Sequence, residues 1–466
     1  MNPRSLVLFV LSLLLTVTLV MGCAEPVEPP QQQQVPPESP ADVVEPEEIP
    51  EPEAMAISET AVRTEAALEA EAADAPLERE LPEDHWLVGT SDVEDMLDAY
   101  IAPEVPREVI AEYGPARLER MGDDRILFLS GSHYDMGYQH GTLMKEEILE
   151  AAQLIRTVGT FAWSGDYSVS IREAWERTSP FIPERYKEEI QGVADATGLT
   201  VEEVQDFTIF PELFHCSGFA IWGNATADGT LYHGRVLDYM RDIGLDKYAV
   251  ILIQQPEGYN AFVNVGYAGM LGSVTGMNDQ HVAIGEMGGS DPEQWDGMPM
   301  TLLVRECLEL GDTLEDVRRI MEETPRTCQF YYVISDSKAD DGRGYALGVA
   351  ADSNSIQFIG PNEHHPQLPR PVEDAVLLSA DDRYQCLVDR VEKMFGQFTH
   401  QEALDLMARG VAMRSNMHNA LFKPETLEFW VANSTVREPA SNRPYRHYNL
   451  AELLAEHPEE ALAAAE

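Results

Sequence analysis

Alternating apolar and polar positions predict many short strands along the middle of the chain. Several neighbouring strands are close enough in sequence to form hairpins, and no regular alternation of strand and helix indicates a parallel sheet. Helices grouped around antiparallel strands therefore predict an α+β fold in layers. The strands are expected at residues 125–130, 219–222, 231–235, 249–254, 261–265, 282–286, 330–335, 345–350, 355–359 and 427–432.

Three helices have a clear start signal. In each, a threonine is followed three residues later by an acidic residue, which is the pattern of a capping box. We therefore expect helices to begin directly after these threonines. The pairs are Thr200 and Glu203, Thr313 and Asp316, and Thr399 and Glu402.

The first 22 residues have the pattern of a secretory signal peptide. Arg4 precedes an uncharged, mostly apolar stretch at residues 6–20, which is too short for a comfortable membrane span. The stretch runs into Leu-Val-Met-Gly-Cys at residues 19–23, which resembles a bacterial lipobox. Lipid on Cys23 would anchor the mature chain without spanning the membrane. We expect a protein of the bacterial cell envelope, facing the periplasm or the exterior.

Composition divides the rest of the chain into three parts. Residues 23–85 are acidic and rich in Pro and Glu, and they lack the apolar content that would repay ordering, so we expect a disordered tether. Residues 86–448 form the predicted folded domain, and residues 449–466 form an acidic, Ala-rich tail. With 44% hydrophobic residues, the chain can bury one large core.

The charge of the chain excludes one class of partner. There are 81 Asp and Glu residues against 32 Lys and Arg, which gives a formal net charge of −49. Binding to nucleic-acid phosphates needs clustered basic residues, so no nucleic-acid partner is expected. No CxxC pair or HExxH motif is present, so we expect no metal and no cofactor.

Three of the five cysteines lie on predicted structural elements. Cys307 and Cys386 fall on helix-like apolar stretches and are interpreted as buried thiols, whereas Cys328 precedes a predicted strand. An oxidising compartment would permit a disulfide among the three, and the sequence does not select a pair.

The fourth, Cys216, opens the most informative segment. A strand is predicted from Cys216, followed by a turn at residues 225–229 and a returning strand, because Asp-Gly at residues 228–229 is typical of hairpin turns. If the turn centres near residue 227, the numbers of partner residues sum to about 454, and Asp238 falls opposite Cys216 within two residues. Arg235 and Asp238 are an odd number of positions apart, so a regular strand would send their side chains to opposite faces.

The sequence around this hairpin resembles the N-terminal-nucleophile hydrolases, specifically the isopenicillin N acyltransferase-like family and its more distant bile-salt and acylethanolamine amidase relatives. The residues Gly-Arg-Val-Leu-Asp at 234–238 match the family's Arg and Asp but lack its intervening Asn. Glycine-rich residues 131–141, residues 269–278 and residues 416–432 resemble three further family segments in the same order.

This resemblance implies a four-layer αββα fold that is made as an inactive precursor. The His215–Cys216 bond would be cut by the Cys216 thiol, leaving an N-terminal chain at residues 86–215 and a C-terminal chain at residues 216–448. Cys216 would then act as the nucleophile, its own α-amine as the base, and Arg235 and Asp238 as catalytic partners.

The oxyanion donors stay open at this stage. Relatives use an Asn before a long C-terminal helix, and the matching stretch here, residues 376–384, contains none. A backbone N–H, Asn278 or Asn416 are the candidates. The simpler interpretation of Asn278 is a turn residue in the left-handed region. His140 and His418 are interpreted as hydrogen-bonded structural histidines.

The expected activity is that of a membrane-anchored cysteine amidohydrolase or acyltransferase, which acts on a small acyl amide or ester. The sequence does not distinguish hydrolysis from acyl transfer and gives no oligomeric state. Two alternatives stay open: a solute-binding lipoprotein, and an uncleaved or inactive protein of the same fold. A binding protein would be expected to have two lobes built on parallel sheets.

Overall fold

The computed structural model describes residues 101–162, 167–209, 215–239, 241–288, 294–366 and 368–456. The predicted signal peptide, the tether with Cys23, the first part of the predicted domain (residues 86–100) and the end of the tail (residues 457–466) lie outside the described residues. Within the described part, no helix has the length and apolar character needed to cross a bilayer.

A ten-stranded sheet forms the larger of two sheets. Its order is β1-β2-β3-β6-β7-β8-β9-β10-β11-β12, and all neighbours pair antiparallel except β3 and β6, which are parallel. The strands are β1 (Glu108–Tyr113), β2 (Ala116–Met121), β3 (Asp124–Gly131), β6 (Ala249–Pro256), β7 (Phe262–Tyr267), β8 (Thr275–Asn278), β9 (Val282–Gly288), β10 (Phe330–Asp336), β11 (Tyr345–Ala351) and β12 (Ile356–Ile359).

A second sheet of six strands, in the order β13-β4-β5-β14-β15-β16, is antiparallel throughout. It faces the larger sheet, with β4 packed against β9 and β10 and with β5 packed against β9. The strands are β4 (His215–Gly223), β5 (Gly229–Asp238), β13 (Ala375–Leu378), β14 (Asn416–Lys423), β15 (Glu428–Asn433) and β16 (Arg446–Asn449).

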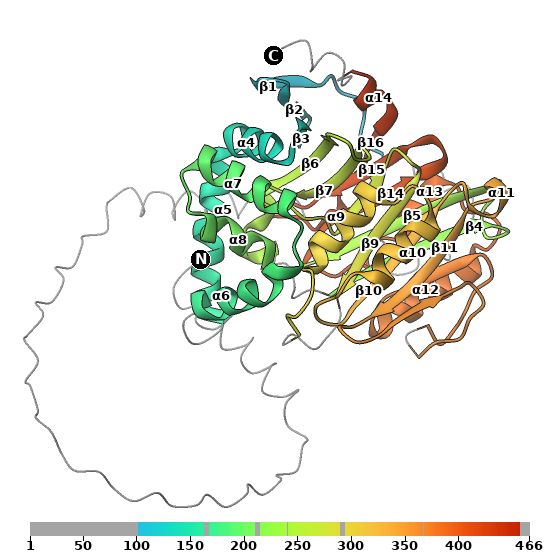
Figure 1. Ribbon diagram of the computed structural model, residues 1–466. Coiled ribbons are helices and arrows are strands. Elements are labelled where there is room, and N and C mark those ends of the chain that lie inside the picture. Colours follow the sequence, from blue (N-terminus) through green and yellow to red (C-terminus); the bar gives the residue numbers. More distant parts are fainter. Residues whose placement is uncertain are drawn as a thin grey trace, which may run out of the picture. The chain divides into compact units, whose positions relative to one another are not determined.

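Helices cover the outer faces of both sheets (Figure 1). On the larger sheet, α4 packs on β3, α9 on β8 and β9, and α10 on β10, while α12 and α13 pack on the smaller sheet. The predicted four-layer αββα sandwich is therefore confirmed. The helices are α4 (His133–Leu143), α5 (Lys145–Ala162), α6 (Tyr167–Thr178), α7 (Glu184–Thr197), α8 (Val201–Ile209), α9 (Met300–Leu310), α10 (Leu314–Glu323), α11 (Ala339–Gly342), α12 (Asp381–Lys393), α13 (His400–Asp405) and α14 (Leu450–Ala455).

The helix starts agree with the capping signals. Thr200 and Glu203 exchange both bonds of a capping box, at 3.2 and 2.9 Å, and Thr399 with Glu402 forms a complete box at the start of α13. Thr313 accepts from the backbone N–H of Asp316 at 3.2 Å at the start of α10. These bonds satisfy N–H groups that the first helical turn leaves without partners.

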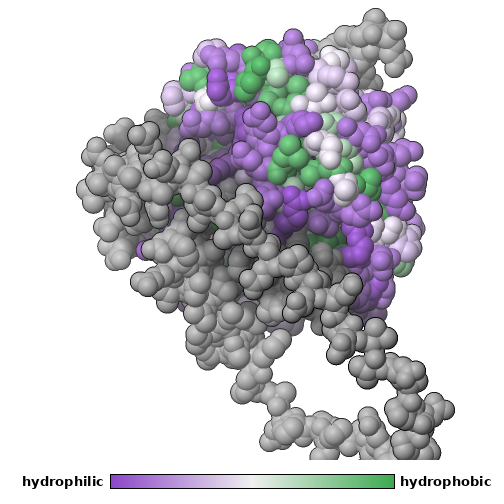
Figure 2. Space-filling model, turned by 90° about the vertical axis from the view of Figure 1, so that its left-hand side faces the viewer, coloured by the Kyte–Doolittle hydropathy of each residue, from purple (hydrophilic) through white to green (hydrophobic). Residues whose placement is uncertain are grey.

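The space between the sheets is apolar over part of its area and polar over the rest. Around β14 and β15, Ala420, Phe422 and Phe429 pack against Ile126 and Val263 of the larger sheet. Around β4 and β5 the buried side chains between the sheets include charged groups, which have to be paired when water is excluded. On the outside, the face of the molecule in Figure 2 is mainly hydrophilic, and its hydrophobic side chains gather in small patches.

Candidate active site

The β4–β5 hairpin fixes the position of Cys216. In the observed register Leu237 is the partner of Cys216 and Asp238 is the partner of His215, so partner numbers sum to 453 along the regular part of the ladder. This register differs by one residue from the predicted one. Arg235 is opposite Gly218.

Cys216 points into the space between the two sheets. Side chains of partner residues lie on the same face of a sheet, and positions two apart share that face, so Cys216, Gly218, Arg235 and Leu237 face the same way. A Cβ on Gly218 would lie 2.7 Å from Sδ of Met287 on β9, which identifies this face as the one toward the larger sheet. The thiol is buried there, with Cys216 only 4% exposed.

Arg235 crosses from one sheet to the other next to this thiol. Its Nη2 lies 3.3 Å from Oε2 of Glu286 on β9, and both side chains are fully buried. The aliphatic part of the Arg235 side chain passes over Gly285, where a Cβ would lie only 3.3 Å from Cδ of Arg235. Glycine at position 285 therefore makes room for the arginine.

Polar atoms without a partner surround this ion pair. Among the described residues, Nε and Nη1 of Arg235, Oε1 of Glu286 and Nε2 of His233 are buried and make no hydrogen bond. A buried donor or acceptor without a partner costs free energy, so such groups mark a place where a ligand or water belongs. The unused donors of Arg235 are available to an acyl carbonyl or to a thiolate.

Asp238 faces away from Arg235, as the odd spacing predicts. Its Oδ2 accepts a hydrogen bond from Nη1 of Arg383 at 2.7 Å, and its Oδ1 accepts one from the Met413 N–H at 2.9 Å. Strand β5 extends through Asp238, and the irregularity lies instead in β14, between Asn416 and His418. Burial raises the pKa of Asp238 to about 6, although the hydrogen bond from the Met413 N–H and the charge of Arg383 lower it.

The intact chain holds the Cys216 thiol in its protonated form. Burial raises the pKa of this thiol to about 11, while Arg235 lowers it, Glu286 and Asp238 raise it, and a backbone hydrogen bond from Asp238 lowers it. Burial also raises the pKa of Glu286 to about 7, against the opposing charge of Arg235. A thiol with such a pKa attacks a carbonyl only slowly unless a nearby base takes up its proton.

An apolar cavity of about 60 Å³ lies next to Leu237, which is opposite Cys216 on the neighbouring strand. Leu237, the partner of Cys216, forms part of its wall, and so does Tyr267, whose pKa is raised by burial and, to a smaller extent, by Asp246 and Cys216, while Arg235 lowers it. The remaining wall comes from α5, α8, the short helix at Leu245–Tyr248, the loop after β7, Tyr239 and Met417 of β14. The cavity has the apolar lining that an acyl chain requires.

Both asparagines that were candidates for the oxyanion site have their amides in use. Nδ2 of Asn278 donates to the carbonyl groups of Leu308 and Gly311 at 3.0 and 2.8 Å, and so ties the end of α9 to the turn after β8. Asn278 was expected in the left-handed region, and this expectation is wrong, because the positive φ in that turn belongs to His281. Its Oδ1 instead accepts two backbone N–H bonds across the turn.

Asn416 is equally occupied. Its Nδ2 donates to the carbonyl of Leu237 at 3.0 Å and to Oδ1 of Asn419 at 2.9 Å, and its Oδ1 accepts from the Ser441 N–H at 2.7 Å. The amide therefore holds the strand backbone opposite Cys216 in place. In residues 376–384, the segment expected to hold an oxyanion Asn, Ser379 contacts Ser217, and their Oγ atoms are 2.6 Å apart.

The two histidines have structural partners. His418 lies between Tyr267, whose Oη is 3.1 Å from Nδ1, and Thr275, whose Oγ1 is 3.0 Å from Nε2. Nε2 of His140 accepts the Gly269 N–H at 3.2 Å. Burial lowers the pKa of both imidazoles, to about 4 for His140, so neither carries a proton at neutral pH.

No disulfide links the other cysteines in the described part of the chain. Cys307 on α9 and Cys328 are buried, and Cys386 on α12 is half-buried rather than buried, contrary to its interpretation as a core thiol. Within the described ranges, no group of three His, Cys, Asp or Glu side chains has the arrangement of a metal site.

Two residues at the site were not predicted from the sequence. Glu286 is a charged residue inside the apolar run at residues 282–287, and this position was the only available signal. No sequence pattern indicated a role for Arg383, because its partner Asp238 is far away in sequence.

Comparisons with known proteins relate the chain to amide-cleaving and acyl-transferring enzymes. Residues 225–357 match the family model of acyl-coenzyme A:6-aminopenicillanic acid acyl-transferase, a range that contains Arg235, Asp238 and Glu286 and begins after Cys216. Protein dcd1B of Dictyostelium discoideum is 24% identical over 75% of this chain and 79% of its own length.

Two further relatives have more informative names. Acid ceramidase of Rattus norvegicus is 26% identical over 40% of this chain, and the match spans only about half (53%) of that enzyme. The solved structure of the Caenorhabditis elegans ortholog of N-acylethanolamine-hydrolyzing acid amidase aligns with 45% of this chain and 93% of its own, at 14% identity and a TM-score of 0.37. The sequence matches support the predicted relationship to the acyltransferase family.

Proposed function

We propose that this protein is an N-terminal-nucleophile amidohydrolase or acyltransferase in which Cys216 attacks the carbonyl of an acyl amide or ester. One observation carries the proposal. The buried thiol at the start of β4 shares a face of the sheet with an arginine that has unused donors, and its strand partner Leu237 lines an apolar cavity. This arrangement supplies a nucleophile, a cation for developing negative charge and a binding site for the acyl group.

The first step of the proposed mechanism is the cleavage of the His215–Cys216 bond. The Cys216 sulfur attacks the carbonyl carbon of His215, the C–N bond breaks, and the nitrogen takes up the thiol proton. Water then hydrolyses the resulting thioester, which leaves a carboxylate on His215 and returns the thiol. The free α-amine has a pKa of about 7.7–8.0, so it can accept the thiol proton near neutral pH.

The second step uses the same pair of groups on substrate. The amine takes the proton of Cys216, the thiolate attacks the acyl carbonyl, and the proton passes to the leaving amine or alcohol. Water or an acceptor amine then releases the acyl group from the thioester. The high pKa of the thiol in the intact chain supports the need for this newly formed base.

The side chains around the thiol take distinct roles in this proposal. Arg235, oriented by Glu286, directs its free N–H groups to the thiolate or to the substrate carbonyl. Asp238, held by Arg383, lies opposite the residue that precedes the scissile bond and receives hydrogen bonds from the new ammonium group.

The substrate class follows from the lining of the cavity. Its wall is made of aliphatic and aromatic side chains, so an apolar acyl group suits it better than a charged or sugar-like group. The names of acid ceramidase and of the acylethanolamine-hydrolyzing amidase accord with acyl amide substrates.

Export and lipid attachment complete the proposal. The lipobox-like residues 19–23 would place a lipid on Cys23, and the acidic segment at residues 23–85 would connect it to the enzyme. Intact-mass measurement of membrane-extracted protein tests this, since a mature chain that starts at Cys23 carries the added mass of the lipid.

The decisive experiment compares wild type with Cys216→Ala on a denaturing gel. Wild type should give two fragments, with the second beginning at Cys216 by N-terminal sequencing, and Cys216→Ala should stay intact. A single full-length wild-type band, together with hydrolysis of acyl amides, would establish an uncleaved thiol hydrolase instead.

A solute-binding lipoprotein is the second candidate. Two antiparallel sheets, with one parallel pair, differ from the two parallel-sheet lobes expected for such a protein. Alkylation of Cys216 separates the two candidates, because it should abolish turnover of an enzyme. A binding protein would show no turnover before alkylation.

A further inference from the structure

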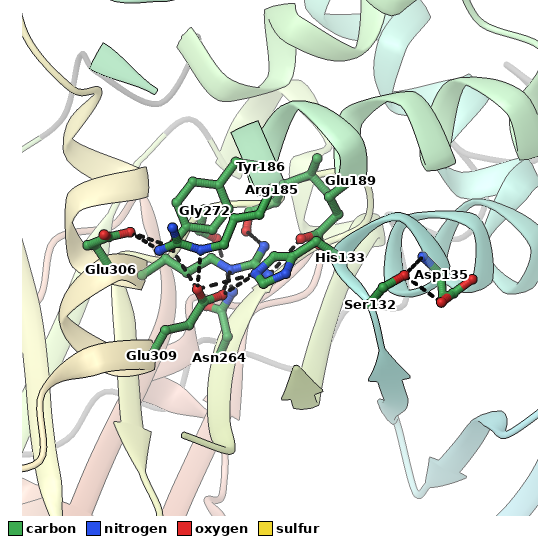
Figure 3. Close-up of polar contacts among 12 residues, drawn as sticks. Ser132, His133, Asp135, Arg185, Tyr186, Glu189, Asn264, Gly272, Glu306 and Glu309 are labelled. Atoms are coloured by element: carbon green, nitrogen blue, oxygen red, sulfur yellow. Dashed lines mark hydrogen bonds and ion pairs between the residues drawn. The ribbon is translucent and has the colours of Figure 1, made fainter. Parts of the chain in front are cut away.

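A buried cluster of charged side chains lies away from Cys216, where α4, α7 and α9 meet. At its centre Arg305 is fully buried and forms ion pairs with Glu189, at 2.6 Å, and with Glu309, at 2.8 Å. Figure 3 shows Glu189 from one side and Glu306 and Glu309 from the other converging on the same place.

Further contacts complete the cluster. Arg185 donates from Nε to Oε2 of Glu309 at 3.1 Å and also pairs with Glu306. The single O–H of Tyr186 is shared between Oε2 of Glu306 at 2.9 Å and Oε2 of Glu309 at 3.0 Å. His133 lies 3.1 Å from Glu309. The three carboxylates face two guanidinium groups and an imidazole, so the charges nearly balance in a region that excludes water.

Three hydrogen bonds to this region hold one loop, residues 268–274, which connects β7 to β8. Nη1 of Arg305 donates to the carbonyl of Leu271 at 2.6 Å, and Nδ2 of Asn264 donates to the carbonyl of Gly272 at 3.0 Å. The Ser273 N–H donates to the carbonyl of Thr301 on α9 at 2.9 Å. Each of these bonds is on the side of the loop that faces α9 or the cluster.

The same loop forms part of the wall of the apolar cavity. Ala268, Met270 and Val274 line the cavity, together with Leu237, the partner of Cys216. A displacement of the loop by a fraction of an ångström would therefore change the depth of the cavity. Among the described residues, no hydrogen bond or ion pair joins the cluster to Cys216, Arg235 or Glu286, and the loop contacts Glu286 through the Glu286 N–H, which donates to the carbonyl of Val274 at 3.0 Å.

We propose that Arg305 is a positioning residue for acyl-chain selection: held by Glu189 and Glu309, it fixes the 268–274 loop and thereby sets the length of acyl group that the cavity accepts. The cavity's role as a substrate site rests on the proposed function. The cluster also joins parts of the chain on either side of position 216. His133, Arg185 and Glu189 precede the proposed cut, and Arg305, Glu306 and Glu309 follow it. These ion pairs would keep the loop in place against α7 after the backbone is cut.

The test measures binding and turnover separately. Binding of cis-parinaric acid, a fluorescent fatty acid, is measured in the Cys216→Ala background, where no reaction occurs. Arg305→Lys keeps the charge but replaces a planar group that donates to Glu309 and to the Leu271 carbonyl with a single ammonium, so it should weaken this binding about tenfold. The matched control is Arg319→Lys on the exposed surface of α10, which should leave binding unchanged.

Turnover is measured with acetyl, octanoyl and palmitoyl amides in the chain that retains Cys216. Arg305→Lys should lower kcat/KM for the palmitoyl amide about tenfold, through KM, and leave the acetyl amide within about twofold. An equal loss for all three amides, or an unchanged profile in a folded variant, would overturn the inference.

A second variant displaces the loop without touching the charges. In Gly272→Ala the new Cβ would lie 2.5 Å from Cβ of Thr301, which pushes the loop away from α9. The same selective loss of long-chain binding supports the inference, and unchanged binding refutes it. If wild type cleaves no amide, the proposed function fails, and parinaric acid binding still decides the role of Arg305.

Discussion

Arg383 donates a hydrogen bond to Asp238 at 2.7 Å and so ties the first turn of α12 to the last residue of β5. The second oxygen of Asp238 is bound by a backbone N–H, and its strand partner is His215. The carboxylate is therefore fixed next to the peptide bond that we propose is cut, with a cation already beside it. This cation opposes the protonation of any amine that forms there.

Replacement of Arg383 by Gln should shift the pH dependence of activity. Without the cation, Asp238 stabilises the Cys216 ammonium group more strongly, so the α-amine should have a higher pKa. In the pH profile of kcat/KM, the apparent pKa on the acidic side should rise by about one unit. Arg370→Gln, which alters a surface ion pair with α12, is the control. An unchanged acidic limb would show that Arg383 does not influence the base.

Glu286 and Glu309 should change stability with pH in opposite directions. Burial raises the pKa of Glu286 to about 7, so its native state holds a proton that the unfolded chain releases above about 4.5. Its contribution to the free energy of unfolding therefore decreases as pH rises from about 4.5 to 7. For Glu309, burial acts to raise the pKa, and Arg305 and His133 outweigh it and lower the pKa to about 2. The contribution of Glu309 to the free energy of unfolding is therefore present above about pH 4.5 and is lost as the pH falls toward 2.

Urea unfolding of Glu286→Gln and Glu309→Gln across this pH range checks both signs. Relative to wild type, Glu286→Gln should become less destabilising as pH rises from 5 to 8, whereas Glu309→Gln should be destabilising at pH 7 and progressively less so in acid. Parallel pH profiles for the two variants would contradict the opposite environments of these carboxylates.

Gly137 in the glycine-rich segment at residues 131–141 should tolerate no larger side chain. A Cβ at position 137 would lie 2.1 Å from the backbone oxygen of Glu189, so α4 and α7 would have to separate. Gly137→Ala should therefore lower the free energy of unfolding by about 1–3 kcal/mol, as overpacking of a core does. Thermal or urea unfolding measures this loss, with the exposed Glu146→Ala as control. A stability equal to that of wild type would mean that the two helices are not in close contact.

The reactivity of Cys216 should depend on the state of the backbone. In the intact chain the thiol is 4% exposed, and burial raises its pKa to about 11, so iodoacetamide should react slowly. After cleavage the adjacent amine can take up the proton, and reaction should be at least about tenfold faster. Mass spectrometry of a partly cleaved preparation should find the label on the C-terminal fragment and little on the full-length chain. Equal labelling of both forms would exclude the amine as the base.

Local patterns predicted most of the strands and nearly the whole register of the central hairpin. Alternation and the Asp228-Gly229 turn gave the pairing of β4 with β5 to within one residue, and the odd spacing of Arg235 and Asp238 gave their opposite faces. Short strands such as β13 and β16, each of four residues, were missed because such a short run contains too few alternations to stand out.

Contacts between distant segments were beyond the reach of sequence patterns. Glu286 acquires its role only when β9 packs on β5, and Arg305 acquires its role only when α9 meets α7. Glu286 is a single charge in an otherwise apolar strand, and Arg305 follows an apolar run on α9, which indicates burial but not the identity of the partner. The left-handed conformation expected at Asn278 was wrong, because its side chain bridges the turn and His281 takes the positive φ.

The strand that begins at His215 has neighbours on both sides, β13 and β5. A newly formed chain end usually frays, and a reactive group placed there would lose its orientation. Here the ladder to β5 reaches Cys216 itself, so breaking the preceding bond would change what the residue can do without changing where it is. The sheet provides, before any cut, the rigidity that a terminal nucleophile would otherwise lack.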